Sequence, residues 1–472
     1  MKAAAAALIA LFVAGCASYR GIEHRSTPAD ASNLQAEKSL GAESDSGAWP
    51  ELDWWKRFGD AQLDALVDEA LAGSPNIRLA RARLDAALAA AQVAGAPLKP
   101  QVSASGDVTR QRFSEHYIFP PPIGGSTFTT TEVALNAGYE LDLWGKNRAA
   151  YEAALGRARA AEVDAFATRL VLSAGVASAY VQLARAFDER DIARRTLEDR
   201  GHVQDLTNQR VRAGLDSRLE LKQVETSIPA ARARVAQAEE AIALARNQLA
   251  ALLGKGPDRG LELERPQLKT MTVALPSHLS ADLLGRRPDI AASRLRAQAA
   301  ARDIASTKAQ FYPNVNLAAL VGVQSVTLGS LLARGSADPS LGAAIRLPIF
   351  DAGRLRGALA ERNAEYDAAI EQYNQALADA LREVVDQLTS MRSVQTQRSE
   401  AEAALASAEE AYDLAVTRYQ AGIGSLLQVL TAETAVLEQR SLRSELQARE
   451  LALSINLVRA LGGGFDLQVA MK

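Results

Sequence analysis

The stretch SPNIRLARARLDAA, residues 74–87, returns later in the chain as RPDIAASRLRAQAA, residues 287–300. Further matches follow in the same order, and Ala213-Gly214 corresponds to Ala421-Gly422. A long and nearly constant period of this kind indicates two copies of one large structural unit, so the sequence predicts a pseudo-symmetric fold. The two predicted copies span residues 49–260 and 261–472.

Four short segments alternate apolar and polar residues, as a strand with two different faces does. In one of them Val133 and Leu135 fall on one face, and Glu132 and Asn136 fall on the other. The four predicted strands span about residues 101–113, 129–142, 314–324 and 340–349. One apolar and one polar face over about ten residues is typical of a transmembrane β-barrel, although a soluble sheet alternates in the same way.

Four strands are too few to close a barrel within one chain. Open strand edges in lipid would leave backbone N–H and C=O groups without hydrogen bonds. Two chains would supply eight strands, whose interior is filled by side chains, so a conducting pore requires at least three chains. The sequence therefore predicts one barrel shared by several copies.

Two long segments without proline follow the strands, at residues 146–212 and 354–420. At roughly 1.5 Å per residue each segment predicts a helix of about 100 Å, which cannot fold back within a compact domain. A glycine-containing turn and a shorter helix of about 54 Å follow each one, at residues 218–253 and 426–461. Together with a helix of about 36 Å at the start of each copy, these segments predict a single α-helical cylinder.

The N-terminus has the features of an export signal. Residues 1–15 contain a positive charge at Lys2, then an apolar stretch and small residues before Cys16. Cys16 is the only cysteine, so the chain forms no internal disulfide. Val13-Ala14-Gly15-Cys16 resembles a bacterial lipobox, in which the cysteine is lipidated; an ordinary signal peptide with an incidental cysteine is the alternative. Residues 16–48 then predict an extended, lipidated tether.

Several functional classes are disfavoured by composition and motifs. A net charge of -3 and a pI near 6.0 give no basic surface for nucleic acid. The apolar stretch from Leu170 to Ala184 is bounded by Arg169 and Arg185, so it predicts a packed helix and not a membrane span. The 4 histidines are scattered, and no Walker loop or nucleophile elbow occurs. We therefore expect no enzyme activity, no metal and no cofactor other than the lipid on Cys16.

Five motifs point to a known family. They are WWKRFGD at 54–60, SPNI at 74–77, YELDLWG at 139–145, RRPDI at 286–290 and RYQAG at 418–422. With these motifs, nearly the whole mature chain resembles the outer-membrane factors of tripartite efflux systems of the RND type. Within these TolC-like channels it is most similar to the lipoprotein subgroup of NodT type.

The resemblance implies a trimeric fold and two protein partners. A homotrimer would combine four strands per chain into a twelve-stranded transmembrane β-barrel, continued by a long periplasmic α-helical barrel. Its location would be the outer membrane, with a lipid anchor. The partners would be a periplasmic adaptor, also called a membrane fusion protein, and an inner-membrane pump of RND type. The channel itself would export drugs or other small molecules passively.

The resemblance also assigns a periplasmic aperture to the two helix tips. Tyr419 and Glu220 match residues that constrict it in the family, whereas Gln428 and Thr431 replace acids of the family's prototype. We expect Arg210 and Arg418, one turn before the tips, to pair with acids of neighbouring helices. The tip-turn residues are Gly214, Ser217, Gly422, Gly424 and Ser425. They are interpreted either as good turns and helix caps or as the adaptor contact.

Two alternatives to small-molecule export remain at this stage. The same duct could serve type I protein secretion. A protein of a different class, a structural periplasmic coiled-coil lipoprotein, would share the long helices. Strands of membrane-spanning length disfavour that second alternative, because a spacer needs none. The transported substrate is not encoded in any motif of the chain.

Overall fold

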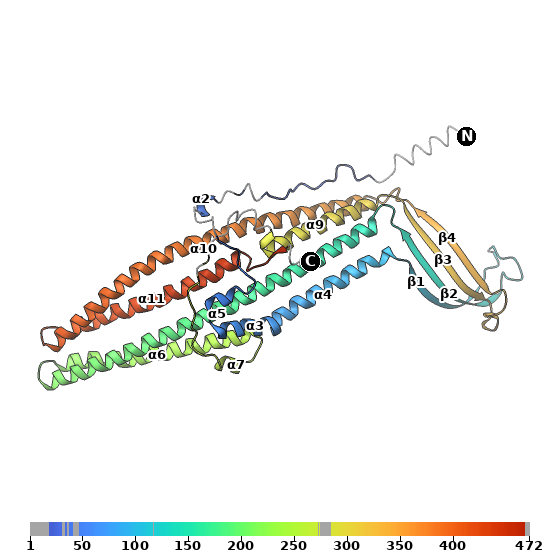
Figure 1. The fold of residues 1–472 in the computed structure, drawn as a ribbon. Coiled ribbons are helices and arrows are strands. Elements are labelled where there is room, and N and C mark those ends of the chain that lie inside the picture. Colours follow the sequence, from blue (N-terminus) through green and yellow to red (C-terminus); the bar gives the residue numbers. More distant parts are fainter. Residues whose placement is uncertain are drawn as a thin grey trace. The chain divides into compact units, whose positions relative to one another are not determined.

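The computed structural model describes residues 18–30, 34, 37–40, 47–116, 118–271, 273 and 285–467. The predicted signal peptide and Cys16 lie outside these residues, as does part of the predicted tether. Figure 1 shows long helices and one group of four strands. The fold is therefore rich in helix with a small antiparallel sheet.

The chain divides into two compact units that do not coincide with the two sequence repeats. The first unit comprises the N-terminal segment to Pro28 with residues 83–161 and 292–373, and the second comprises residues 29–82, 162–291 and 374–472. The predicted limits 49–260 and 261–472 thus describe repeats and not compact units. Each repeat sends its strands into the first unit and its helical tip into the second, where it packs with the other repeat.

The sheet of the first unit contains all four predicted strands. They are β1 (Gln101–Arg112), β2 (Thr127–Leu141), β3 (Asn314–Ser325) and β4 (Ala337–Arg346). The strands are antiparallel in the order β1-β2-β3-β4, so β2 and β3 join the two repeats (Figure 1). One row of paired residues across the sheet is Val102, Ala137, Ala319 and Leu341. The next row is Ser103, Asn136, Leu320 and Ser340. The register thus gives the sheet one apolar and one mainly polar face.

The last strand lies three residues earlier than predicted, at 337–346 instead of about 340–349. Pro339 pairs with Val321 inside β4, a position that a proline tolerates because β4 is an edge strand. At the other end Asn314 pairs with Arg346 and is the first residue of β3. β3 therefore has no further residue with which an extension of β4 toward Pro348 could form hydrogen bonds. Pro348 itself also lacks an N–H donor.

Helices complete the first unit. The helices α4 (Pro75–Gly95) and α9 (Pro288–Ala309) precede the strands, with the short 3₁₀ helix η3 (Ala96–Leu98) after α4. The long helices α5 (Lys146–Arg212) and α10 (Arg354–Gln420) have the predicted bounds. Gly156 of α5 packs against α9, where an added Cβ would lie 3.1 Å from that of Ala299. The small residue therefore permits close helix packing.

Residues 18–28 of the first unit form no helix or strand and are attached to the helices. The backbone N–H groups of Arg25 and Ser26 donate to Asp367 Oδ1 at 2.9 and 2.8 Å. The ring of Tyr19 contacts Phe311 edge-on at 5.6 Å. The residues that follow Cys16 are thus held in the unit that contains the sheet.

The second unit packs around an aromatic core. It contains η2 (Trp54–Phe58), α3 (Ala61–Gly73), α6 (Arg218–Leu252), α7 (Asp258–Leu261) and α11 (Leu426–Ala460), with the short α2 (Glu37–Leu40). Trp54, Trp55 and Phe58 are buried beside α5, α6 and α11. Asp60 caps α3 by accepting from Gln62 N at 2.9 Å and accepts from Tyr180 Oη, also at 2.9 Å. The WWKRFGD motif therefore has a structural role.

One apolar window of α5 is long enough to cross a membrane by length and composition, and α5 is the only such helix among the described residues. Of that window 61% is buried inside the structure. Tyr180 and Leu183, for example, belong to the aromatic core. The window is thus the face of a packed helix, as the sequence predicts.

Alanine substitutions at two glycines of the second unit should change the stability of the protein in opposite directions. Gly254 has φ +71°, and an added Cβ would lie 2.4 Å from Pro75 Cδ, so Gly254→Ala should lower the thermal unfolding temperature. Gly201 lies within α5 with no atom within 4 Å of an added Cβ. Gly201→Ala should therefore raise stability, by about 1 kcal/mol. Far-ultraviolet circular dichroism during heating measures both; equal shifts would contradict the packing described here.

Candidate aperture at the helix tips

The first tip turn connects α5 to α6. Gly214 adopts φ +73°, and the N–H of Leu215 donates to the carbonyl of Arg210 at 2.9 Å, which closes the end of α5. Ser217 then caps α6, because its Oγ accepts from Leu219 N at 3.1 Å. Glu220 completes a capping box by accepting from Ser217 N at 2.9 Å. The predicted cap is thus confirmed.

Glu220 is bound to its own turn. The hydroxyl of Ser217 donates to the Glu220 carboxylate, and this hydrogen bond, with those from the backbone, lowers the pKa of Glu220. The carboxylate is therefore ionised at neutral pH. It supplies a negative charge at the tip, as predicted, and its orientation is fixed by the cap.

The second tip turn connects α10 to α11 and has the same design. Gly422 adopts φ +79°, and Gly424 lies so close to α10 that a Cβ there would be 3.0 Å from Arg418 Cβ. Ser425 stands at the N-cap of α11, and its N–H donates to Gln428 Oε1 at 3.3 Å. Gln428 thus takes the capping position that Glu220 holds in the first repeat. This tip lacks the corresponding charge.

Arg210, Asp216 and Tyr419 connect the two tips, which lie side by side (Figure 1). Arg210 binds Asp216 with two hydrogen bonds, from Nε to Oδ2 at 2.8 Å and from Nη2 to Oδ1 at 3.1 Å. Its Nη1 donates to the carbonyl of Tyr419 at 2.6 Å. The Tyr419 hydroxyl donates to Asp216 Oδ2 at 2.5 Å and lies 3.0 Å from Thr207 Oγ1. We call these four residues the tip network.

The tip network is shielded from solvent by apolar side chains. Tyr419 is 1% exposed and Arg210 8% exposed, and the guanidinium lies over the tyrosine ring, 4.4 Å from its centroid. Tyr419 also packs in a small cluster with Val203, Val224, Leu426 and Val429. Because these residues come from α5, α6, α10 and α11, the cluster joins the ends of all four helices.

The contacts shift the ionisation of both acidic members of the network. The hydrogen bonds from Arg210 lower the pKa of Asp216 more than burial raises it, and the Tyr419 hydroxyl adds to the lowering. Burial, with the hydrogen bond to the Asp216 carboxylate, raises the pKa of Tyr419 to about 12. At neutral pH Asp216 is therefore charged and Tyr419 is neutral, which are the forms that the hydrogen bonds require.

A second ion pair lies farther from the tips and also joins the repeats. Arg200 of α5 binds Glu433 of α11, from Nε to Oε1 at 2.9 Å, and donates to the carbonyl of Ser227 at 2.9 Å. The side chains of the pair are 13% and 8% exposed. The pair is thus more enclosed than a typical surface salt bridge.

The structure brings together only some of the predicted aperture residues. Arg210 and Tyr419 meet in the tip network, whereas the Arg418 side chain is exposed and forms no ion pair with any residue that the structure describes. Gly424 stands where the first repeat has Asp216, so Arg418 has no equivalent partner within its own turn. Gln428 is exposed and acts as a cap.

Asp216 is the residue that the motif analysis missed. It follows Arg210 across the turn and precedes the capping Ser217, so it lies where a carboxylate can turn back toward the arginine. Aligning the two repeats position by position reveals Asp216 opposite Gly424 and Tyr419 opposite Val211. That asymmetry was the available signal, because each tip carries the residue that the other lacks.

Comparison with known proteins places the chain in a family. The model of the family described as "Outer membrane efflux protein" matches residues 66–255 and 279–463. This chain belongs to that family. The family match confirms the prediction of an outer-membrane efflux channel, made above from motifs. The efflux channel therefore belongs to the outer membrane, and the long helices and four-stranded antiparallel sheet of the chain are the elements predicted for one subunit.

Relatives and solved structures agree with this assignment. The efflux channel is 39% identical to the fusaric acid resistance protein FusA of Burkholderia cepacia over 360 residues, which cover 75% of this chain and 68% of FusA. It is 32% identical to the multidrug resistance outer membrane protein MdtP of Escherichia coli strain K12, over 89% of this chain and 88% of MdtP. The crystal structure of the outer membrane protein VceC from Vibrio cholerae superposes with a TM-score of 0.83 at 37% identity, covering 89% of this chain and 100% of VceC.

The two repeat-equivalent arginines should differ in their effect on the tips. Arg210→Gln removes the bidentate pair with Asp216 and should accelerate backbone amide exchange in both tip turns. Arg418→Gln, at the matching exposed position, should leave exchange near wild type. Hydrogen–deuterium exchange with mass spectrometry of the tip peptides measures the difference. Equal acceleration by the two variants would show that the tip network does not order the turns.

Proposed function

We propose that the efflux channel works as a homotrimer, a passive duct that exports drugs or other small organic molecules. The four-stranded sheet carries this proposal. Its outer strands, β1 and β4, each have a neighbour on one side only. In lipid the open sides need partners, and three chains would supply twelve strands, enough for a water-filled pore. A spacer lipoprotein would have no use for such a sheet.

The names of the relatives support export of small molecules over protein secretion. FusA is named for resistance to fusaric acid, and MdtP for multidrug resistance. We propose a periplasmic adaptor and an inner-membrane pump of RND type as partners, since a passive duct has no energy source of its own. The tip turns with Gly214 and Gly422 are the proposed adaptor contact. No catalytic activity and no cofactor are proposed.

The tip network is proposed to hold the duct closed at its periplasmic end. It joins the first tip to the second through Arg210, Asp216 and Tyr419, so separating the tips requires breaking these contacts. The ionised Glu220 adds a negative charge beside them. A ring of such charges in a trimer would favour cations at the constriction. Gln428 adds no charge to this ring.

We expect the channel to open when the pH falls far enough to protonate Asp216 and remove its negative charge. Because its pKa is lowered from 3.8, the network's contribution is complete above pH 3.8 and is lost as pH falls through the lower folded value. Tyr419, with a pKa raised from 10.0, weakens the network only above pH 10.0. Planar-bilayer conductance of the wild type should therefore be small at neutral pH and should increase in acid.

Variants test whether Asp216 is the group responsible. Asp216→Asn should raise conductance at neutral pH and should abolish the acid-induced increase. Arg418→Gln serves as the control and should behave as wild type. If Asp216→Asn still showed the acid-induced increase, another group would control the aperture. The mass of the same preparation reports whether the conducting species is a trimer.

We also propose that Cys16 carries lipid. Two residues that follow Cys16 in the sequence support this. The carbonyl of Ser18 accepts a hydrogen bond from Arg356, and Tyr19 packs on Phe311. Ser18 and Tyr19, shortly after Cys16 in the sequence, are thus attached to the unit that contains the sheet. Intact mass spectrometry should find lipid on the wild type and on Ala17→Ser, and none on Cys16→Ala. Lipid retained on Cys16→Ala would refute the assignment.

A further inference from the structure

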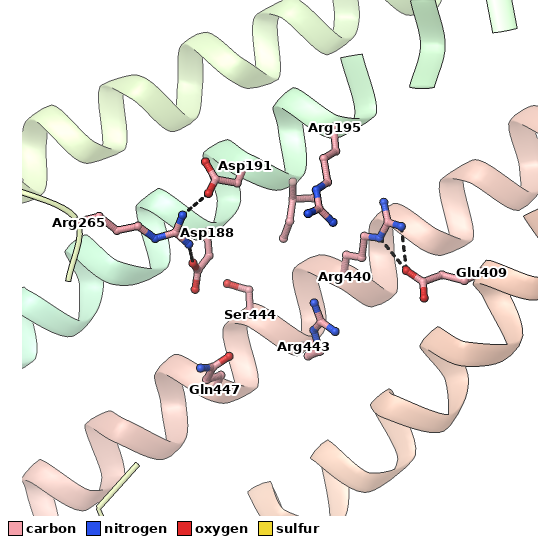
Figure 2. Close-up of a pocket in the computed structure, with 10 residues that line it drawn as sticks. Asp188, Asp191, Arg195, Arg265, Glu409, Arg440, Arg443, Ser444 and Gln447 are labelled. Carbon is pink, nitrogen blue, oxygen red and sulfur yellow. Dashed lines mark hydrogen bonds and ion pairs between the residues drawn. The ribbon is translucent and has the colours of Figure 1, made fainter. Parts of the chain in front are cut away.

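A polar cavity of about 520 Å³ lies in the second unit, between α5 and α11. Side chains of α5, α10 and α11 and of the segment after α7 gather around it (Figure 2). The lining residues are Asp188, Asp191, Ile192, Arg195, Arg265, Glu409, Arg440, Arg443, Ser444 and Gln447. Four of them are arginines. The tip network and the predicted aperture residues have no part in this cavity.

Two of the four arginines are neutralised within the chain. Arg265 forms ion pairs with both Asp188 and Asp191, and Arg440 donates from Nε and Nη2 to Glu409 Oε1 at 3.0 and 2.8 Å (Figure 2). These pairs occupy every carboxylate that lines the cavity. The acids therefore leave no unpaired negative charge to repel an anion.

The other two arginines have no direct partner, although each acts electrostatically on a nearby carboxylate, Arg443 on Asp188 and Arg195 on Asp199. Arg195 of α5 and Arg443 of α11 are exposed at the cavity and form no ion pair or hydrogen bond with the residues that the structure describes. Guanidinium groups bind carboxylates and phosphates through paired, charge-assisted hydrogen bonds. Two unpaired arginines facing one cavity from two helices thus favour an anion with several oxygen atoms.

A buried hydroxyl supplies an independent indication of a ligand. Ser444 is 6% exposed, lines the cavity, and its Oγ has no hydrogen-bond partner among the described residues. Leaving a buried hydroxyl unsatisfied costs free energy, so such groups in proteins normally have a partner. Gln447, one turn farther along α11, adds an amide donor to the same wall.

We propose that this cavity binds a small multivalent oxyanion, such as inorganic phosphate or a tricarboxylate. Arg195 and Arg443 bind its oxygens from two sides, and Ser444 donates to it from the floor. The volume lies in the range of small-molecule sites, about 300 to 1,000 Å³. A bound anion would bridge α5 of the first repeat and α11 of the second. The site goes beyond the transport function proposed above and does not depend on it.

Titration calorimetry of the full-length oligomer in detergent tests the site, with citrate and inorganic phosphate as separate probes. Both should bind the wild type. Arg195→Gln/Arg443→Gln should weaken citrate binding by about tenfold or more, since hydrogen bonds to charged groups are lost. Arg232→Gln/Arg449→Gln is the matched control, because it removes the same charge at exposed positions outside the cavity. This control should retain wild-type affinity.

The variants distinguish anion binding in the cavity from nonspecific electrostatic attraction of anions to the protein surface. Ser444→Ala changes no charge and should weaken binding by a smaller factor, which tests the cavity even if the double arginine variant fails to fold. Circular dichroism and the oligomer mass check folding. No binding of either probe by the wild type would overturn the proposal. Equal loss in the two double variants, or unchanged binding in Ser444→Ala, would also overturn it.

Discussion

Backbone hydrogen bonding of the four-stranded sheet is the constraint on which the rest of the architecture depends. Within the chain β2 and β3 satisfy their N–H and C=O groups on both sides, whereas β1 and β4 have one open side each. These open sides belong to different repeats, so in the proposed oligomer β1 of one copy would pair with β4 of the next. Such head-to-tail contacts form a closed ring when the rotation between copies is right. The long helices that leave each strand pair would then continue this ring into the periplasm.

Duplication explains why the tips resemble each other, and divergence explains why they bind each other. Both turns contain a left-handed glycine and a capping box, with Glu220 in one and Gln428 in the other. The first copy alone has the Asp216 carboxylate, and the second alone has Tyr419. The hydrogen bond between the tips thus joins a residue present only in the first copy to one present only in the second.

The sequence predicts the elements better than their contacts. Alternation and the absence of proline located every strand and both long helices, because those signals act within a few residues. The β4 limits were wrong because Pro339 is tolerated only on an edge strand, which depends on sheet order. Asp216 was missed for a related reason. Its partner Tyr419 is distant in sequence, and only the packing of α5 beside α10 and α11 brings the two together.

Two enclosed ion pairs take part in the contacts between the repeats and bear on how the proposed opening proceeds. Contacts from α5 to the second repeat include the tip network and, farther from the tip, the Arg200–Glu433 pair. Both pairs are enclosed, with side chains 13% and 8% exposed in the inner pair and 9% and 10% exposed in the tip pair, so breaking either leaves a buried charge without compensation. Burial raises the pKa of Glu433, whereas the hydrogen bonds from Arg210 lower the pKa of Asp216. Falling pH therefore discharges the inner pair before the tip pair, and an acid-driven opening weakens the ties at both ends of the stretch of α5 between Arg200 and Arg210.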